Sequence, residues 1–510
     1  MIAKSSSSKH SMWAGRGANV RYYRWLCLLA LIGMLLALSQ RAVAAQSIDE
    51  QTLSGIDAYI NRQMDDLRIP GLALAIVHGD QIVVAKGYGI ANPQGVVVTP
   101  QMLFSIGSLT KSFTAIAIMQ LVEDGTLELD APVQRYLPWF QVADPVASAS
   151  ITLRHLVTHT SGLPRDLESS GKAEDATNPL RLEQRLRELN AMPLEVALGS
   201  YSYSNAGYML LAMIIQQVTG QSYEAYLTTH VFEPLGMSQS FGSIDAARQA
   251  QPATGYRYWF GQPVAAAEPA YRSGPGNGGL YASVNDMGRY LIAQLNQGRL
   301  GNAAILSPAG MATLHQPAVE RAGGWYAMGW GVSQTNGRTL LSHSGQTYNY
   351  FARMVLVPEQ AWGVVVLQNS QYTVRLLAGD LRQDALADGV VSILLGETLV
   401  DPPSSSMFWL IYAGFGLLIV VQLAGIVRAS RIRRRTQPAM RRSWWRIGLP
   451  LAGNLLWAGL MLLGLPAVVN LTEVGYQIPD LTAILLASGG LALGWSIIRI
   501  MWVVRANTNL

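Results

Sequence analysis

A serine and a lysine stand three residues apart in the stretch FSIGSLTKSF, where a long apolar run begins. Positions i and i+3 of a helix lie on one face, so Ser108 and Lys111 can meet there. The helix predicted from Lys111 to Glu123 is apolar on nearly every face and is therefore expected to be buried. Burial disfavours a charged amine, and a neutral amine beside a serine can accept its proton. The ordinary alternative is that Ser108 is a helix N-cap and that Lys111 reaches solvent.

Two further stretches carry residue types that could complete a nucleophilic site. Tyr203 and Asn205 lie in YSYSN, in a predicted loop before a helical run, and HSGQ, residues 343–346, stands at the start of a predicted strand. A phenol can act as a general base when cationic neighbours lower its pKa, and an asparagine amide can hold a substrate amide. A strand edge can offer a backbone N–H to an oxyanion. Together these stretches favour catalysis over a capped helix.

Other catalytic chemistry finds less support in the sequence. His155 and His159 stand four apart, as two metal ligands on a helix do, but no glutamate follows the first as the zincin pattern requires. The pattern Gly-x-Ser-x-Gly of an α/β-hydrolase elbow does not occur. We therefore expect neither a metal nor a cofactor.

The elements that must position these residues follow from the apolar pattern. Residues 71–92 predict two strands joined by a turn at His78–Asp80, and a second β-rich region spans residues 329–370. The patterns between these regions are helical, notably at residues 111–123, 180–190, 206–219 and 285–298. Strands at both ends with helices between predict one sheet built from the two ends of the domain, with a helical lobe inserted.

The N-terminal residues 1–45 have the order of a secretory signal. Basic residues precede the apolar run at residues 25–39, and the small residues AVAA follow at 42–45. We expect cleavage near Ala45 or Gln46; the alternative is an uncleaved anchor helix. In either case the domain after residue 45 is exported.

Three apolar runs near the C-terminus, residues 407–427, 447–469 and 481–498, are each long enough to cross a hydrocarbon core of about 30 Å as a helix. The loop at 428–446 has eight arginines and no acid, whereas the loop at 470–480 has no basic residue. By the positive-inside rule the arginine loop and the C-terminus are cytoplasmic. These patterns predict a multi-pass inner-membrane protein whose domain, residues 46–400, faces the periplasm or outside, joined by a linker at 401–406.

The charge distribution excludes a nucleic-acid partner for the exported domain. Residues 1–45 and 407–510 contribute +6 and +8 to a net charge of +5, so the middle of the chain carries about −9. Nucleic-acid binding needs a basic surface. The only cysteine, Cys27, lies in the signal segment, so the domain must be held together by its core rather than by disulfides.

The motifs taken in order amount to a family resemblance. Ser-Leu-Thr-Lys at 108–111, Tyr-Ser-Asn at 203–205 and His-Ser-Gly at 343–345 resemble those of the serine β-lactamase and penicillin-binding-protein superfamily. The resemblance is closer to the class C β-lactamase-like serine hydrolases, peptidase family S12, and it covers roughly residues 56–369, with matching stretches HLVTHTSGLP, GNGGLYASVNDMGRYL and VPEQAWGVVVLQN. It implies an α/β (α+β) fold with an antiparallel sheet flanked by helices.

The resemblance also implies roles for the residues that match. Ser108 would attack and become acylated, Lys111 and Tyr203 would take and return its proton, and His343 would stabilise charge near Tyr203. The implied substrate-binding residues are Asn205, Ser344, Gly345 and Gln346. Asn205 would position the substrate amide, and the backbone N–H groups of Ser108 and Gln346 would form the oxyanion hole.

His343 departs from the lysine that β-lactamases and carboxypeptidases of the superfamily carry. That lysine helps to bind a substrate carboxylate, whereas a histidine is only fractionally charged at neutral pH. The departure favours aminopeptidase, amidase or esterase activity over the hydrolysis of β-lactams that confers antibiotic resistance. Arg353 could supply a replacement charge, but we expect it to be a surface residue.

The combined features predict a membrane-tethered serine hydrolase acting on a small-molecule or peptide substrate. An exported domain of this kind followed by three membrane helices resembles the prodrug-activating peptidases that remove an acyl-D-amino-acid leader. The alternatives are a D,D-peptidase or esterase on cell-wall or lipid-linked substrates, a β-lactam sensor without turnover, and a non-catalytic scaffold. The oligomeric state stays open.

Overall fold

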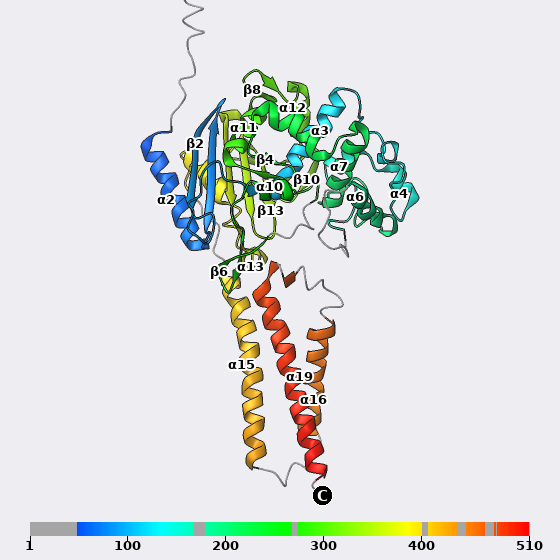
Figure 1. Ribbon diagram of the computed structural model, residues 1–510, viewed down its shortest axis with the longest axis vertical. Coiled ribbons are helices and arrows are strands. Elements are labelled where there is room, and N and C mark those ends of the chain that lie inside the picture. Colours follow the sequence, from blue (N-terminus) through cyan, green and yellow to red (C-terminus); the bar gives the residue numbers. More distant parts are fainter. Residues whose placement is uncertain are drawn as a thin grey trace, which may run out of the picture. The chain divides into compact units, whose positions relative to one another are not determined.

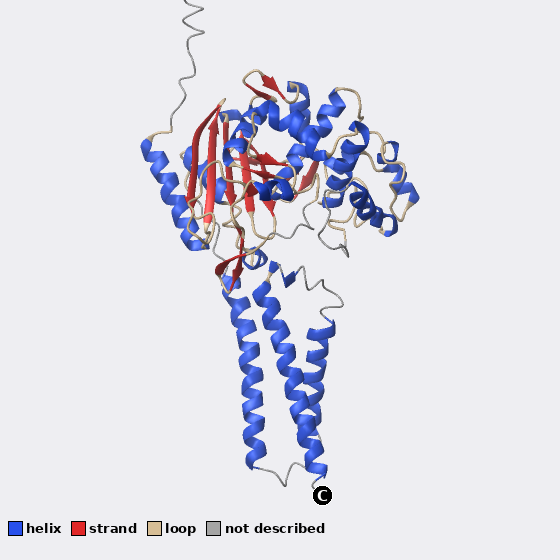
Figure 2. Cartoon of the chain, viewed as in Figure 1, coloured by secondary structure: helices blue, strands red, loops and turns tan. Residues whose placement is uncertain are grey.

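The structure is a computed structural model that describes residues 48–167, 179–267, 274–399, 406–435, 445–464, 474–475 and 477–508. The expected signal segment, residues 1–45, and residues 401–405 of the expected linker lie outside the described residues. Within the described part of the chain, strands gather into one large sheet and several small ones, and helices surround them (Figure 2).

An eight-stranded sheet forms the centre of the domain, and each neighbouring pair of its strands is antiparallel (Figure 1). From edge to edge its strands are β10 (Val319–Arg321), β11 (Gly324–Tyr326), β12 (Gly331–Thr335), β13 (Arg338–Gln346), β14 (Phe351–Val357), β15 (Trp362–Gln368), β1 (Gly71–His78) and β2 (Gln81–Gly89). Strand β1 pairs with β15, which confirms that the two ends of the domain build one sheet. The predicted turn at His78–Asp80 joins β1 to β2.

Helices bury the centre of this sheet. Helix α11 (Val284–Leu295) packs against β1, β2 and β15, while α14 (Leu386–Leu394) packs against β14, β15 and α2 (Glu50–Leu67). Residues Leu72–Val77 of β1 are therefore fully buried. A strand that is covered on both faces has no polar side, which explains why its sequence is a continuous apolar run rather than an alternating one.

A helical lobe between the two β regions contains several of the predicted site residues. Its long helices, α3 (Thr110–Glu123) and α7 (Asn205–Thr219), pack against each other. Eleven of the 14 residues of α3 are buried, which confirms the prediction of a buried helix. The shorter helices of the domain are α4 (Pro145–Ser150), α5 (Leu153–Val157), α6 (Pro179–Leu186), α8 (Tyr223–Leu227), α9 (Glu233–Leu235), α10 (Ile244–Gln249), α12 (Pro308–His315) and α13 (Thr373–Leu377).

Short strands complete the domain. One three-stranded sheet contains β3 (Phe104–Ser105), β7 (Tyr281–Ala282) and β4 (Ser240–Phe241). The other three-stranded sheet contains β16 (Ser370–Gln371), β5 (Tyr256–Trp259) and β6 (Gln262–Ala265), and a two-stranded sheet pairs β8 (Arg299–Leu300) with β9 (Ala303–Ala304). Strand β3 matters most for the site, because it leads directly into the turn that carries Ser108.

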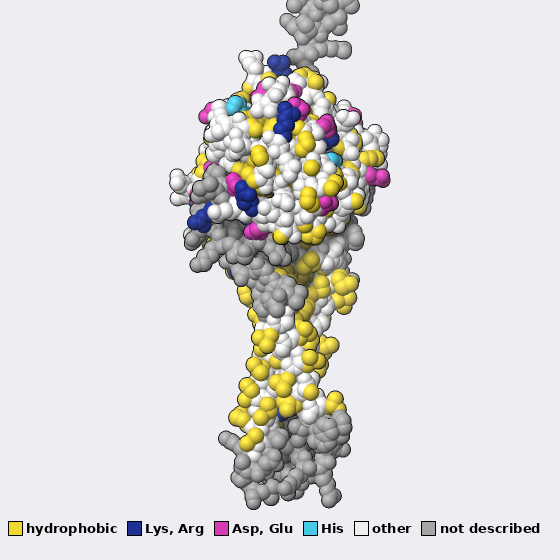
Figure 3. Space-filling model, turned by 90° about the vertical axis from the view of Figure 1, so that its right-hand side faces the viewer, with side chains coloured by type: hydrophobic (Ala, Val, Ile, Leu, Met, Phe, Trp, Pro, Cys, Tyr) yellow, Lys and Arg dark blue, Asp and Glu magenta, His cyan; other side chains and the backbone are white. Residues whose placement is uncertain are grey.

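The described residues after 405 are mainly helical: α15 (Ser406–Arg435), α16 (Trp445–Gly459) and α19 (Pro479–Thr508). The apolar segments Met407–Arg428 and Pro479–Trp502 are long enough to cross a membrane, whereas the apolar helix Gly448–Gly464 is shorter. Residues 465–469 of the predicted middle crossing lie outside the described part. Hydrophobic side chains cover much of the described surface of these helices (Figure 3). Length and composition therefore support two of the three predicted crossings.

Candidate active site

The turn that carries Ser108 is a short 3-10 helix, η1 (Gly107–Leu109), between β3 and α3. Gly107 has a φ of 49°, in the left-handed region that glycine adopts without strain. The N-cap of α3 is Leu109, and it makes no side-chain capping bond. The alternative that Ser108 caps the helix is therefore wrong. Its hydroxyl lies instead 3.1 Å from the amine of Lys111.

Lys111 is fully buried at the start of α3, and its amine has three polar neighbours. Nζ lies 3.1 Å from Ser108 Oγ and 2.7 Å from each of two carbonyl oxygens, Oδ1 of Asn205 and the backbone oxygen of Asn277. Burial lowers the pKa of this amine well below its ordinary value, an effect that the Asp166 carboxylate opposes. A neutral amine has two hydrogens and one lone pair, so it can donate to both carbonyls and accept from Ser108. The structure thus supplies a proton acceptor beside the serine.

Tyr203 lies in the loop before α7, and its phenol forms a hydrogen bond with Ser108. Its ring lies 4.7 Å from Lys111 Nζ and 5.1 Å from the Arg165 guanidinium. Burial nevertheless raises the Tyr203 pKa, and this outweighs the lowering effects of Ser108 and Arg165. The lowering by Arg165 is therefore too small to give the low phenol pKa that a general base would require. At neutral pH Tyr203 is protonated and can donate a proton.

His159 supports the Tyr203 loop rather than a metal. Its Nδ1 accepts the N–H of Ser204 at 3.1 Å, and its ring centroid lies 4.2 Å from that of Tyr203. His155 accepts the N–H of Thr152 at 3.1 Å, in a capping box at the start of α5. Both imidazoles therefore serve local structure. Among the described residues, no group of three or more His, Cys, Asp or Glu side chains could hold a metal ion.

Asn205 begins α7, and its amide bridges two side chains of the site. Oδ1 accepts from Lys111 at 2.7 Å, while Nδ2 donates to Asp166 Oδ1 at 2.7 Å. These two bonds fix the amide so that its oxygen faces the amine. The predicted contact of Asn205 with a substrate amide stays a prediction. Sequence reasoning missed both Asp166 and Asn277 as parts of the site. Asp166 lies just after the matching stretch HLVTHTSGLP and Asn277 lies within the matching stretch GNGGLYASVNDMGRYL, but the resemblance assigns neither of them a role.

His343 lies near the end of β13, not at the start of a strand as the sequence suggested. Its Nδ1 donates to the Ser344 carbonyl at 2.7 Å, so its Nε2 accepts from the Tyr326 hydroxyl at 3.2 Å. Burial first, and then the Lys111 charge, lower the His343 pKa to about 3. The imidazole is therefore neutral at pH 7 rather than fractionally charged. It can orient neighbours by hydrogen bonds, but it supplies no cation near Tyr203.

Strand β13 approaches the nucleophile turn closely because both carry a glycine. A Cβ on Gly345 would lie 3.2 Å from the Ser108 nitrogen, and one on Gly107 would lie 2.6 Å from the Gln346 nitrogen. Strand β12 pairs only with the first part of β13, as far as Ser342, so among the described residues no strand pairs with the HSGQ end on that side. The backbone nitrogens of Ser108 and Gln346 are thereby brought together, as an oxyanion hole requires.

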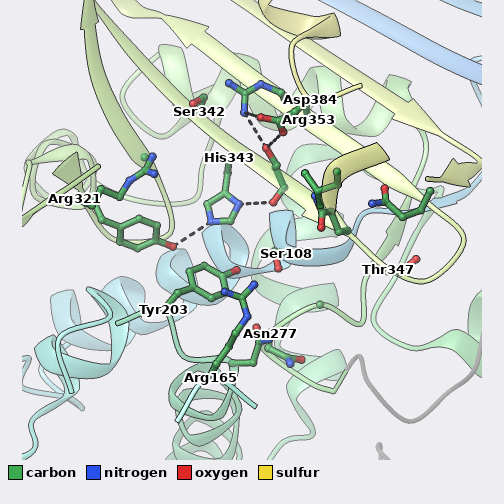
Figure 4. A pocket seen from close by; sticks show the side chains of 18 of the residues that line it. Ser108, Arg165, Tyr203, Asn277, Arg321, Ser342, His343, Thr347, Arg353 and Asp384 are labelled. Carbon is green, nitrogen blue, oxygen red and sulfur yellow. Dashed lines mark hydrogen bonds and ion pairs between the residues drawn. The ribbon is translucent and has the colours of Figure 1, made fainter. Parts of the chain in front are cut away.

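A cavity of about 760 Å³ opens over the nucleophile (Figure 4). The predicted site residues that line it are Ser108, Tyr203, Asn205, His343, Ser344 and Gln346. Lys111 lies behind this surface, with its side chain fully buried. The fold thus brings together residues that the sequence separates by more than 200 positions, as the motifs predict. The cavity is also lined by Arg165, Arg321, Arg353 and Asp384.

Arg353 corrects an expectation, because it is not a surface residue. Its side chain on β14 is only 15% exposed. The guanidinium donates to Asp388 through Nε at 2.5 Å and through Nη2 at 2.9 Å, and to Ser344 Oγ through Nη1 at 2.8 Å. Asp388 thus compensates its charge. Arg353 is not a free replacement for the lysine that His343 lacks.

Comparisons with known proteins agree with this geometry. Residues 56–389 match the family described as Beta-lactamase. The chain is 30% identical over 328 residues to Protein flp of Staphylococcus aureus (strain MW2), an alignment that covers 63% of this chain and 64% of that protein. The chain therefore spans less than two thirds of the length of this relative.

Solved structures show the same fold. The octameric penicillin-binding protein homologue from Pyrococcus abyssi aligns with a TM-score of 0.59 and 28% identity, covering 68% of this chain and 78% of that one. The class C beta lactamase from Rhodobacter sphaeroides aligns with a TM-score of 0.55 and 23% identity, covering 67% of this chain and 98% of that one. The family match extends over well more than half of the sequence. The chain belongs to the beta-lactamase family, within the β-lactamase and penicillin-binding-protein-like superfamily of serine hydrolases.

Proposed function

We propose that this protein is a membrane-anchored serine hydrolase of the S12 type, which cleaves an amide or ester through an acyl-enzyme on Ser108. One observation carries the proposal: the buried amine of Lys111 lies 3.1 Å from Ser108 Oγ, with its pKa lowered by burial. A serine is a weak nucleophile until an adjacent base takes its proton. Here the base is built into the helix that follows the nucleophile.

Acylation begins when Lys111 takes the proton of Ser108 and Oγ attacks the substrate carbonyl carbon. The carbonyl oxygen becomes negative, and the backbone N–H groups of Ser108 and Gln346 stabilise it. The protonated Lys111 can return a proton through the Tyr203 phenol, which hydrogen-bonds to Ser108. That proton goes to the leaving nitrogen or oxygen as its bond to carbon breaks. Water then attacks the ester, with the same groups acting in reverse.

The substrate class follows from the charges around β13. His343 is neutral and the charge of Arg353 is compensated by Asp388, so neither side chain offers the free cation that carboxylate-binding relatives have as a lysine at position 343. This favours amides and esters without a carboxylate beside the scissile bond. Peptides with an acyl-D-amino-acid leader are the class that we propose first. A D,D-peptidase would have to bind a terminal carboxylate at this position.

Membrane anchoring is part of the proposal. The apolar segments Met407–Arg428 and Pro479–Trp502 support it by length and composition. The eight arginines of the loop at 428–446 support a cytoplasmic position for that loop, and hence an active site outside, by the positive-inside rule. A cysteine-accessibility experiment tests this, with single cysteines placed at Ser150 in the domain and at Ser443 in the arginine loop of a Cys27→Ser chain. Labelling of both positions in sealed cells by a membrane-impermeant maleimide would contradict the topology.

The catalytic proposal is tested by intact mass of the detergent-solubilised full chain after exposure to a neutral fluorophosphonate. We expect one adduct, absent in Ser108→Ala and unchanged in Ser150→Ala, whose serine is exposed outside the pocket. Turnover of acyl-D-amino-acid amides should depend on Ser108 in the same way. An adduct that forms without turnover of any amide or ester would favour a sensor. An adduct that survives in Ser108→Ala would refute the assignment of the nucleophile.

A further inference from the structure

The hydroxyl of Ser344, next to His343 on β13, is already engaged on both sides. It accepts from Arg353 Nη1 at 2.8 Å and donates its only hydrogen to Asp384 Oδ1. Figure 4 shows Arg353 and Asp384 together beside His343. A substrate carboxylate at this place could not receive the Ser344 hydrogen unless it displaced Asp384. The hydroxyl is therefore not available to bind an anion.

The charges around Ser344 leave one carboxylate uncompensated. Arg353 makes a two-point ion pair with Asp388, while its contact with Asp384 Oδ2 is longer, at 3.5 Å. His343 contributes no charge at neutral pH, because burial lowers its pKa to about 3. Within the group of Arg353, Asp384 and Asp388, one cation thus faces two carboxylates, which leaves this group with a net charge of −1.

Asp384 is the member of this group that a substrate can reach. Its side chain is 34% exposed and lines the cavity, whereas that of Arg353 is 15% exposed. An ionised carboxylate only accepts hydrogen bonds, so the group that binds it must be a donor. Two other cations line the cavity: Arg321 of β10, whose charge acts on His343 from the side of β13 opposite β14, and Arg165, which lies over Tyr203. They do not neutralise Asp384 through any ion pair shown among the described residues.

We infer that Asp384 is a specificity-determining residue, which makes the subsite beside Ser344 select an ammonium or another hydrogen-bond donor of the substrate and reject a carboxylate. This inference rests on the proposed acyl-enzyme function and names its substrate class: amides and esters that carry a free amine near the scissile bond. In a peptide with an acyl-D-amino-acid leader that amine would belong to a side chain or to the leaving group, because the leader's own nitrogen is acylated. Repulsion between two carboxylates in a partly solvated pocket is sufficient to change kcat/KM about tenfold.

Two matched series of phenyl esters test the inference with the full chain in detergent. One series varies the acyl group among β-alanyl, propionyl and succinyl, and the other varies the phenol among aminomethyl, unsubstituted and carboxylate forms. We expect the wild type to prefer the amine over the carboxylate about tenfold or more in at least one series. Asp384→Asn should reduce that preference about tenfold. Asp388→Asn should reduce it too, because it frees Arg353 to neutralise Asp384.

The control is Asp57→Asn. The Asp57 side chain is 29% exposed, and like Asp384 it contacts both a cation and a hydroxyl group: it pairs with Lys86 and accepts a hydrogen bond from the Tyr88 hydroxyl. Asp57 does not line the pocket. This variant should keep the wild-type preference. Labelling by the neutral fluorophosphonate is measured in every variant to show that the nucleophile is intact, and it should proceed equally in the wild type and in Asp57→Asn. An unchanged amine preference in Asp384→Asn, with labelling intact, would overturn the inference alone, whereas loss of labelling in the wild type would overturn the acyl-enzyme as well.

Discussion

Replacing Gly345 by alanine tests whether the close approach of β13 to the nucleophile turn builds the oxyanion hole. The added Cβ would lie 2.0 Å from the Ile106 carbonyl oxygen, which is closer than real atoms approach, so the strand must move away. Overpacking of this kind costs about 1–3 kcal/mol of folding free energy. Loss of one oxyanion donor lowers kcat about 10²–10³-fold. We therefore expect a protein that still folds but whose kcat/KM falls about 100-fold or more.

The matched control is Gly337→Ala, in the turn that begins the same strand. Gly337 has a φ of 74° and open space around its Cβ position, so alanine there meets only backbone strain. That strain costs about 1–2 kcal/mol, comparable with the cost at Gly345. Hydrolysis of a neutral phenyl ester and the thermal unfolding midpoint are measured for both variants. If Gly345→Ala loses no more activity than Gly337→Ala, the contact between β13 and the turn does not set the oxyanion geometry.

Three further predictions concern proton transfer, each measured by stopped-flow acylation with a neutral ester. Lys111→Met should lower kcat/KM about 100-fold or more and remove the acid limb of the pH profile, along which activity falls as the amine becomes protonated; retention of that limb would show that another group titrates. Asp166 raises the Lys111 pKa, so Asp166→Asn should move the acid limb to lower pH, and a shift to higher pH would contradict the electrostatics. His343, with a pKa of about 3, stays neutral between pH 5 and 8, so wild type and His343→Gln should have profiles of the same shape there; an inflection found only in the wild type would show that the imidazole titrates.

Much of the fold could be predicted because its strands are marked locally. Strands β1 and β15 are apolar runs bounded by turn residues, and their pairing follows from burial on both faces. The sequence pattern predicts HSGQ at the start of a strand, whereas β13 begins at Arg338 and ends at Gln346. Asn336 and Gly337 form the Asn-Gly signal of a tight hairpin between β12 and β13. A hairpin turn at these two residues predicts a strand that begins at about residue 338, so HSGQ lies at the end of that strand. There it meets the Ser108 turn.

The site could be predicted only as far as its motifs extend. Ser108 and Lys111 share one turn of chain, so their contact is a local property. Asp166 contacts Asn205, and Asn277 contacts the Lys111 amine, from loops distant in the sequence. Asn277 lies in the matching stretch GNGGLYASVNDMGRYL, but nothing local indicates that either residue reaches Lys111 or its partner. The sequence also does not show in which direction the Tyr203 pKa is shifted, because the shift depends on how far the folded lobe excludes water from the phenol. Long-range packing, not motif chemistry, supplies this information.

The same burial shifts the pKa values of Lys111 and Tyr203 in opposite directions, which favours different roles for them in the proposed mechanism. Excluding water lowers the pKa of the amine and raises that of the phenol, because it disfavours the charged form of each. A lysine at position 343 would lower both values, since a nearby cation repels the ammonium and stabilises the phenolate. The neutral His343 leaves Tyr203 protonated. If acylation takes place on Ser108 as proposed, we therefore expect it to start from the Lys111 amine, with Tyr203 as the donor that returns the proton.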